Sequence, residues 1–168
     1  MAGSWMRQSV WVLTLAAVLG TGLTAGVFFA FSNFIMKALG MVAADRGIAV
    51  MQSINVTVIN PLFMLILFGT AAACIPLAIF GFSAMSRPGA TWLLVGCGLY
   101  LAGSILVTAV FNVPLNNGLA GINADSSGTE FWLKFLKEWT AWNHVRAWAS
   151  ALASMAFAIA LCRLSHAS

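Results

Sequence analysis

The stretch VWVLTLAAVLGTGLTAGVFFAFSNFIM, Val10 to Met36, decides the fold class of this chain. It contains no charged residue, and about 20 consecutive apolar residues suffice for a helix to cross the hydrocarbon core of a bilayer. The apolar core of a signal peptide is shorter, roughly 7 to 15 residues. The sequence therefore predicts a first membrane-spanning helix over residues 10–36 that is not cleaved.

The composition of the whole chain agrees with burial in a membrane. Of its 168 residues, 61% are hydrophobic and 7% are charged, whereas about a quarter of the residues of a soluble domain are charged. Asn60 followed by Pro61 is typical of the start of a helix, and Pro114 with the Asn-Asn-Gly run after it is expected to stop one. We expect spans over residues 10–36, 61–85, 91–111 and 142–163.

Four spans with short connectors predict one all-α domain over residues 1–168, an integral membrane antiparallel four-helix bundle. Residues 40–60 carry polar side chains such as Gln52 among apolar ones, which is typical of a connector helix lying in the membrane interface. An even number of spans places both termini on one side. The Lys and Arg totals of the two sides do not decide the orientation, but the basic residues that directly flank the spans favour cytoplasmic termini.

The net charge of +4 is scattered through the connectors, so the basic side chains are interpreted as interfacial anchors and not as a nucleic-acid-binding patch. The predicted partner is the lipid bilayer, and the sequence leaves open whether the chain forms a homo-oligomer. Cys74, Cys97 and Cys162 each lie alone in an apolar run without metal-ligand spacing. We therefore predict no metal site.

Because helix direction alternates, the strongly polar residues of the four spans gather at one end of the bundle. Polar groups in hydrocarbon need partners or a water-filled cavity. The amides either cross-link the helices or line a polar-ended pocket between them. In the first span Gly22 and Gly26 predict a close helix contact, with Phe29 and Asn33 on the same face. The candidate substrate-binding residues are Asn33, Asn55, Asn60, Asn112, Asn116, Trp139, Trp142 and Phe29.

The segment EWTAWNHVR, Glu138 to Arg146, opens the last span. At about 100° per residue, Asn143 and Arg146 project toward the bundle, whereas His144 projects toward lipid unless a neighbouring copy covers it. An arginine in a span must snorkel, pair with an acid such as Glu138, or bind an anion. A histidine is an ordinary general base or metal ligand. The candidate catalytic residues are Arg146, Asn143 and His144.

Four segments carry a family resemblance: GVFFAFSNFIMKAL (26–39), MQSINVTVINPLF (51–63), FNVPLNNGL (111–119) and WTAWNHVRAWAS (139–150). Together they resemble the anthrone oxygenase-like family of small four-helix membrane proteins, whose fungal relatives oxidise anthrones to anthraquinones in polyketide synthesis. The resemblance implies a lipophilic aromatic substrate, dioxygen as co-substrate and no organic cofactor. The resemblance implies an aromatic slot supplied by Trp139, Trp142 and the phenylalanine cluster Phe28, Phe29, Phe31 and Phe34. The donors to a developing oxyanion would be Arg146, Asn143, Asn112 and Asn116.

Two other functions stay open at this point. A metal- or haem-dependent membrane redox protein would use His144 as a ligand. A non-enzymatic membrane protein that binds a small molecule would use the asparagine cluster structurally. Whether the chain is an enzyme, and which residue would act as the base, cannot be read from these residues.

Overall fold

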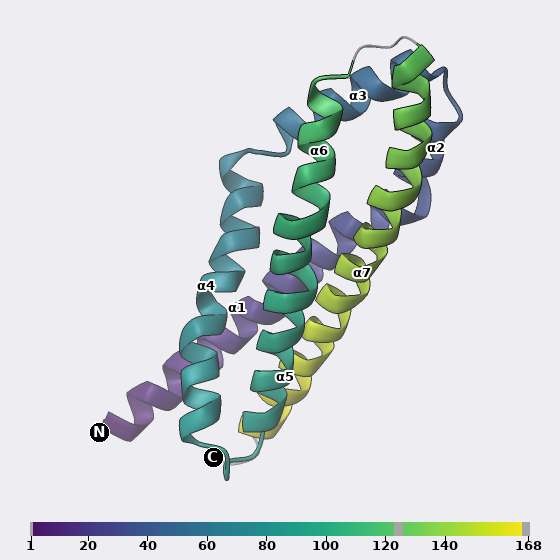
Figure 1. Ribbon diagram of the computed structural model, residues 1–168. Helices are drawn as coiled ribbons and strands as arrows, with labels where there is room; N and C mark the ends of the chain where they lie inside the picture. The colour runs from purple at the N-terminus through teal and green to yellow at the C-terminus, as the bar shows by residue number, and fades with distance from the viewer. Residues whose placement is uncertain (1, 123–125, 166–168) are drawn as a thin grey trace.

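The computed structural model describes residues 2–122 and 126–165, and within them every regular element is a helix. Four helical columns run alternately up and down, with Ala2 and Ser165 at the same end (Figure 1). The all-α antiparallel bundle is therefore confirmed. The elements are α1 (Ala2–Ala30), η1 (Phe31–Ile35), α2 (Met36–Gly40), α3 (Ala44–Thr57), α4 (Pro61–Ser83), α5 (Ala90–Tyr100), η2 (Leu101–Leu106), η3 (Thr108–Asn112), α6 (Val113–Ala120) and α7 (Ser126–Ser165), of which η1, η2 and η3 are π-helical.

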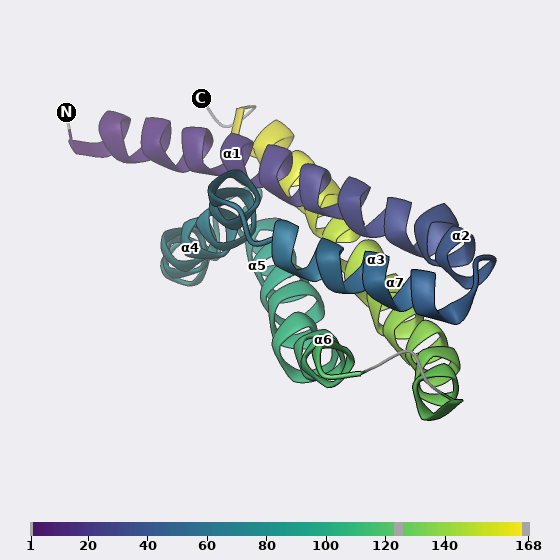
Figure 2. The same ribbon diagram turned by 90° about the horizontal axis from the view of Figure 1, so that it is seen from above.

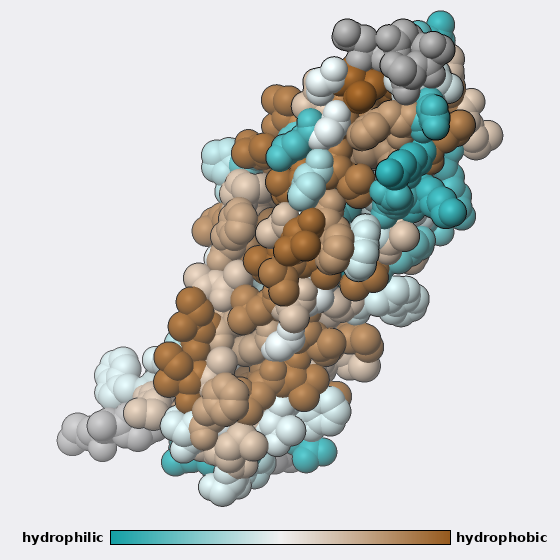
Figure 3. Space-filling model, in the orientation of Figure 1, coloured by the Kyte–Doolittle hydropathy of each residue, from teal (hydrophilic) through white to brown (hydrophobic). Residues whose placement is uncertain are grey.

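All four columns are long and apolar enough to cross a membrane. A broad hydrophobic surface lies between more hydrophilic ends (Figure 3), and large apolar side chains such as Leu65 and Phe82 are exposed on it. The chain is a multi-pass membrane protein; which side its termini face stays a prediction. The apolar stretches with spanning length are Trp5–Gly40, Pro61–Ser83, Ala90–Ala120 and Gly128–Leu164.

The helix stop predicted at Pro114 is wrong, because the helix continues through Pro114 to Ala120. A proline inside an α-helix lacks one donor and its ring clashes with the carbonyl four residues earlier. The π-helical turn Thr108–Asn112 ends two residues before this proline. A π-helical turn already interrupts the regular backbone hydrogen bonds there, so the helix can continue past the proline. The sequence pattern at residues 112–118 therefore marks a change of helix geometry and not a stop.

The helix that carries the predicted fourth span begins well before residue 142, since α7 starts at Ser126 and has 40 residues. At about 1.5 Å per residue it is roughly 60 Å long, twice the roughly 30 Å hydrocarbon core of a bilayer. Its first part packs under α3, which lies over the upper end of the bundle between α2 and α6 (Figure 2). The predicted connector helix is thus confirmed as α3, and it shields an apolar face of α7.

Two apolar cores result. The larger core fills the bundle around Leu77, Tyr100 and Phe157. The smaller core lies beneath α3 and includes Met51, Trp132 and Trp139. A cavity lined by residues of both cores lies where the two meet.

The close helix contact predicted at Gly26 is wrong: a Cβ added there would meet nothing within 4 Å. A Cβ on Gly22 would stand 3.5 Å from Ser154 Oγ, an ordinary contact. The close approaches lie elsewhere. A Cβ on Gly20 would collide with Thr70, and one on Gly103 with Ala149. The GxxxG spacing in the first span therefore does not mark its tightest interface.

Gly96 is expected to be essential for packing α5 against α7. A Cβ at Gly96 would stand 2.7 Å from the ring of Phe157, which is fully buried in the larger core. We expect Gly96→Ala to lower the free energy of unfolding by about 1–3 kcal/mol, the usual cost of overpacking. Thermal unfolding in detergent would measure the loss.

The matched control is Gly98→Ala, two residues further along the same helix, where a Cβ would meet nothing within 4 Å. It is expected to be neutral or stabilising by about 0.5–1 kcal/mol, because alanine is the better helix former. Equal stability of the two variants would contradict the proposed packing role of Gly96.

Candidate functional site

A layer of buried polar side chains separates the two apolar cores. Ser32, Asn112, Asn143 and Arg146 are all at most 5% exposed. They come from η1, η3 and α7, so three of the four columns contribute. Two of these elements are π-helical turns, which interrupt the regular hydrogen-bond ladder and often occur at functional sites.

Asn143 is the centre of the hydrogen-bond network in this layer. Its Nδ2 donates to the backbone carbonyl of Phe28 at 2.7 Å and to Ser32 Oγ at 2.6 Å. Its Oδ1 accepts from Arg146 Nη2 at 2.6 Å. Asn143 therefore ties α7 to the first column beside η1 and orients the guanidinium group of Arg146.

Arg146 is buried and has no acidic partner among residues 2–122 and 126–165. Its Nη1 donates to Thr108 Oγ1 at 3.2 Å, and its Cζ lies 4.2 Å from the ring centre of Phe28 and 5.1 Å from that of Trp139. Its Nε has no hydrogen-bond partner among the described residues. The aromatic faces stabilise the cation only in part.

The predicted pairing of Glu138 with Arg146 does not occur. Glu138 lies on a more exposed turn of α7, where its Oε1 is 3.9 Å from Lys134 Nζ. No other ion pair is found within residues 2–122 and 126–165. A buried charge without a counter-charge is costly, so the surroundings of Arg146 favour the binding of an anion.

The guanidinium group lines a cavity of about 240 Å³. The wall opposite consists of apolar side chains, among them Phe63 and Leu67 of α4. Trp139 Nε1 donates to Asn116 Oδ1 at 2.7 Å, which leaves the Asn116 amide nitrogen as a second donor at the cavity wall. The lining residues are Val27, Phe28, Phe31, Met51, Ile54, Asn55, Val58, Ile59, Phe63, Met64, Leu67, Phe68, Thr108, Val113, Asn116, Trp139 and Arg146.

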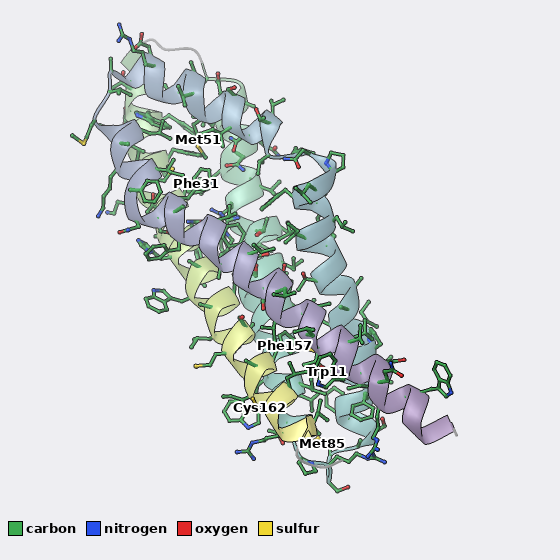
Figure 4. The ribbon with its side chains drawn as sticks, turned by 180° about the vertical axis from the view of Figure 1, so that it is seen from behind. Trp11, Phe31, Met51, Met85, Phe157 and Cys162 are labelled. Atoms are coloured by element: carbon green, nitrogen blue, oxygen red, sulfur yellow. The ribbon has the colours of Figure 1, made fainter. Side chains whose placement is uncertain are left out.

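Figure 4 shows how the upper wall of this cavity is built. Phe31 and Met51 lie near each other at the upper end, one from the first column and the other from α3. The cavity is therefore enclosed partly by α3. Most of the cavity lining is aliphatic or aromatic carbon. The polar part of the lining consists of the guanidinium group of Arg146, the amides of Asn55 and Asn116 and the hydroxyl group of Thr108.

Several predicted site residues do come together. Asn55, Asn116, Trp139 and Arg146 line the same cavity. Asn143 and Asn112 lie behind it in the polar layer, where Asn112 Nδ2 donates to the carbonyl of Trp139 at 3.2 Å. The functional roles of these residues stay predictions, but their proximity is a structural fact.

The other predicted site residues lie elsewhere. Asn60 caps α4, accepting from Phe63 N at 3.0 Å. Trp142 stacks on Phe111 at 3.6 Å between ring centres and does not line the cavity. Phe29, Asn33 and His144 line a separate groove on the outer surface. Phe29 and Asn33 were expected to face the inside of the bundle, and this expectation is wrong, because both are exposed.

Two polar residues that bond to Asn143 or Arg146 were not predicted as site residues: Ser32 and Thr108. Thr108 had a readable signal, since Ser104, Thr108 and Asn112 repeat every four residues in an otherwise apolar run. That spacing places them on one helix face. Ser32 gave no comparable signal, because it lies in the π-helical turn η1, which departs from a regular helical projection.

No group of three His, Cys, Asp or Glu side chains that could hold a metal ion occurs in the described parts of the chain. In comparisons with known proteins, no curated protein and no solved structure matches the sequence. The family model described as anthrone oxygenase matches residues 61–156. The matched region extends from α4 into α7 and contains Thr108, Asn143 and Arg146. With more than half of its length matched, the chain belongs to the anthrone oxygenase family.

Proposed function

We propose that this protein is an oxygenase that oxidises the methylene group of an anthrone-type aromatic to a carbonyl group, using dioxygen as co-substrate and no organic cofactor. The observation that carries the proposal is the buried guanidinium group of Arg146, which faces a cavity and has no acidic partner among the described residues. The family match supports the same reaction class.

The cavity suits a flat, lipophilic ring system. Its volume of about 240 Å³ is close to the lower end, about 300 Å³, of ordinary small-molecule sites. Phe28, Phe31 and Trp139 offer aromatic faces, which stack on planar ligands. An oxygen atom at one edge of the ligand would lie against Arg146, with Thr108 and Asn116 as further polar groups.

The reaction requires an anion at that oxygen. When the methylene carbon loses a proton, the negative charge delocalises through the central ring onto the oxygen atom of the existing carbonyl group. The product is an enolate. The enolate transfers one electron to dioxygen, the two radicals combine, and a carbon–oxygen bond forms. Protonation gives a hydroperoxide, which loses water to leave a carbonyl group. One oxygen atom of dioxygen ends in the product and the other in water.

Arg146 would stabilise the enolate through charge and hydrogen bonds that are already in place, the largest kind of catalytic contribution in many enzymes. Among the described residues, no histidine, aspartate or glutamate lines the cavity. The proton is therefore proposed to pass to water, and the protein acts by favouring the anion over its neutral form. His144 lies on the outer groove and takes no part in this scheme.

The test is the reaction itself. Purified protein in detergent micelles, given an anthrone under air, should form the anthraquinone faster than the same micelles without protein. Dioxygen uptake should equal product formation, and labelled dioxygen should leave one labelled atom in the new carbonyl group. Tight binding without turnover would reject the enzyme and leave a small-molecule-binding protein.

The cofactor question is answered on the same sample. Element analysis and an absorption spectrum are expected to show no stoichiometric metal or haem in protein that is fully active. If the activity of different preparations rises in proportion to their content of a bound metal, the cofactor-free scheme is wrong and the reaction depends on the metal.

A further inference from the structure

A second site lies on the outer face of the bundle, and we propose that it binds one anionic phospholipid. The headgroup phosphate lies at Lys37 and His144, and one acyl chain runs along the groove past Gly26. This proposal does not depend on the proposed oxygenase reaction, because the site is separated from the cavity by Asn143 and Ser32.

The groove is lined by two stripes of residues, one from α1, η1 and α2 and the other from α7. Figure 4 shows α1 and α7, the long helices of these two stripes, lying side by side. Its volume is about 380 Å³. The two stripes run antiparallel, so Lys37 and His144 share the end nearest α3 while Gly26 and Ala151 share the other. The lining residues are Ala25, Gly26, Phe29, Ser32, Asn33, Lys37, His144, Ala147, Trp148 and Ala151.

The lower part of the groove has the shape of a channel for a hydrocarbon chain. Its floor consists of small residues, and a Cβ on Gly26 would meet nothing within 4 Å. Its walls are Phe29 and Trp148, which are 57% and 67% exposed. Small residues between two projecting rings leave a furrow that only an external apolar group can fill.

The upper part of the groove is basic and rich in donors. Lys37 is exposed. Within the described parts of the chain it makes no ion pair and no acidic residue lines the groove. Lysine binds phosphate as a compact point charge, and its long stem reaches the polar boundary of a membrane. His144 and Asn33 add neighbouring hydrogen-bond donors.

Ser32 provides a further donor, buried at 4% exposure in the wall of the groove. Its Oγ accepts a hydrogen bond from Asn143 Nδ2, and it donates to no described residue. The hydroxyl hydrogen is therefore available to a ligand oxygen. Both the charge and the donors of this end match an anionic headgroup, and neither matches an apolar one.

A second copy of the chain fits the groove less well. Two copies in the same membrane orientation, related by a twofold axis, would bring the same surface face to face. Lys37 and His144 of one copy would then meet Lys37 and His144 of the other without an acid between them. An anionic lipid removes this repulsion and fills the furrow at the same time.

Native mass spectrometry of the delipidated protein, supplied with phosphatidylglycerol or phosphatidylcholine, tests the proposal. We expect one phosphatidylglycerol per chain and a preference over phosphatidylcholine of about fivefold, the factor that one basic side chain contributes near an anionic lipid. Lys37→Gln should abolish the preference. Lys137→Gln, an exposed lysine of α7 outside the groove, should retain it.

A third variant tests the channel. Gly26→Leu places a side chain in open space, so it should fold normally, and it should weaken binding of both lipids alike. Equal preference in Lys37→Gln and Lys137→Gln would overturn the headgroup assignment. Unchanged lipid binding in Gly26→Leu would overturn the chain assignment, and a dimer that excludes lipid would assign the groove to a second copy.

Discussion

Arg146→Gln is expected to lower kcat/KM for anthrone oxidation by about a hundredfold to a thousandfold, the usual loss when a donor to a developing oxyanion is removed. Glutamine retains a polar end group that can reach Thr108 or Asn143, but it carries no charge. The enolate would then form in an apolar cavity without a counter-charge. Dioxygen uptake with purified variant and wild-type protein measures the effect.

The stability of the same variant separates catalysis from folding. Arg146 is only 5% exposed and has no acidic partner in the described part of the chain, so its removal relieves an uncompensated buried charge. The unfolding temperature of Arg146→Gln is therefore expected to equal or exceed that of the wild type. A variant that loses stability and activity together would instead make Arg146 a structural residue.

The control is the same substitution at an arginine outside the site. Arg87 is exposed in the turn between α4 and α5, at the opposite end of the bundle from α3. Arg87→Gln should change neither turnover nor unfolding temperature. If both variants have wild-type turnover, the anion-binding role of Arg146 is wrong.

The existence and order of the spans could be predicted, because each span depends only on the length of its own apolar run and not on contacts with distant parts of the chain. Their ends could not. The first part of α7 bears lysines and tryptophans that are typical of a headgroup region. Its apolar face is covered by α3, however, and the burial of Trp132 and Phe135 there depends on a contact between distant parts of the chain.

The orientation of the last span was also predictable, since α7 is regular and a 100° projection is accurate for it. Asn143 and Arg146 are buried and His144 is exposed, as the projection requires. In the first span the inward face was assigned from glycine spacing. That assignment placed Phe29 inward, whereas Phe28 is the ring that contacts Arg146.

The π-helical turns explain why side-chain partners were harder to predict than spans. Each turn of this kind inserts about one residue into the helical repeat, so every later residue is rotated relative to a regular projection. Turns over 31–35, 101–106 and 108–112 flank the polar layer. The sequence carries a regular spacing for Ser104, Thr108 and Asn112, but the π-helical turns decide which of these side chains meet Arg146 and Trp139.

A carboxylate placed beside Arg146 is expected to abolish activity while the fold is retained. Thr108 Oγ1 lies 3.2 Å from Arg146 Nη1 and lines the cavity. Thr108→Asp would therefore supply the missing counter-charge from within the protein. The guanidinium group would be neutralised before any substrate arrives, and the substrate enolate would meet a competing anion at its own binding position.

Thr108→Asn is the matched control, because asparagine has the size of aspartate without its charge. Both variants lose the hydroxyl group that donates to the Ser104 carbonyl at 2.7 Å, so this loss cancels between them. We expect Thr108→Asp to reduce kcat/KM by at least about a hundredfold and Thr108→Asn to stay within about tenfold of wild type. Like Arg146→Gln, Thr108→Asp should not lower the unfolding temperature, since a buried cation gains a partner. Equal activity of the aspartate and asparagine variants would show that the charge of Arg146 does not act on the substrate, because the only difference between them is a negative charge next to that guanidinium group.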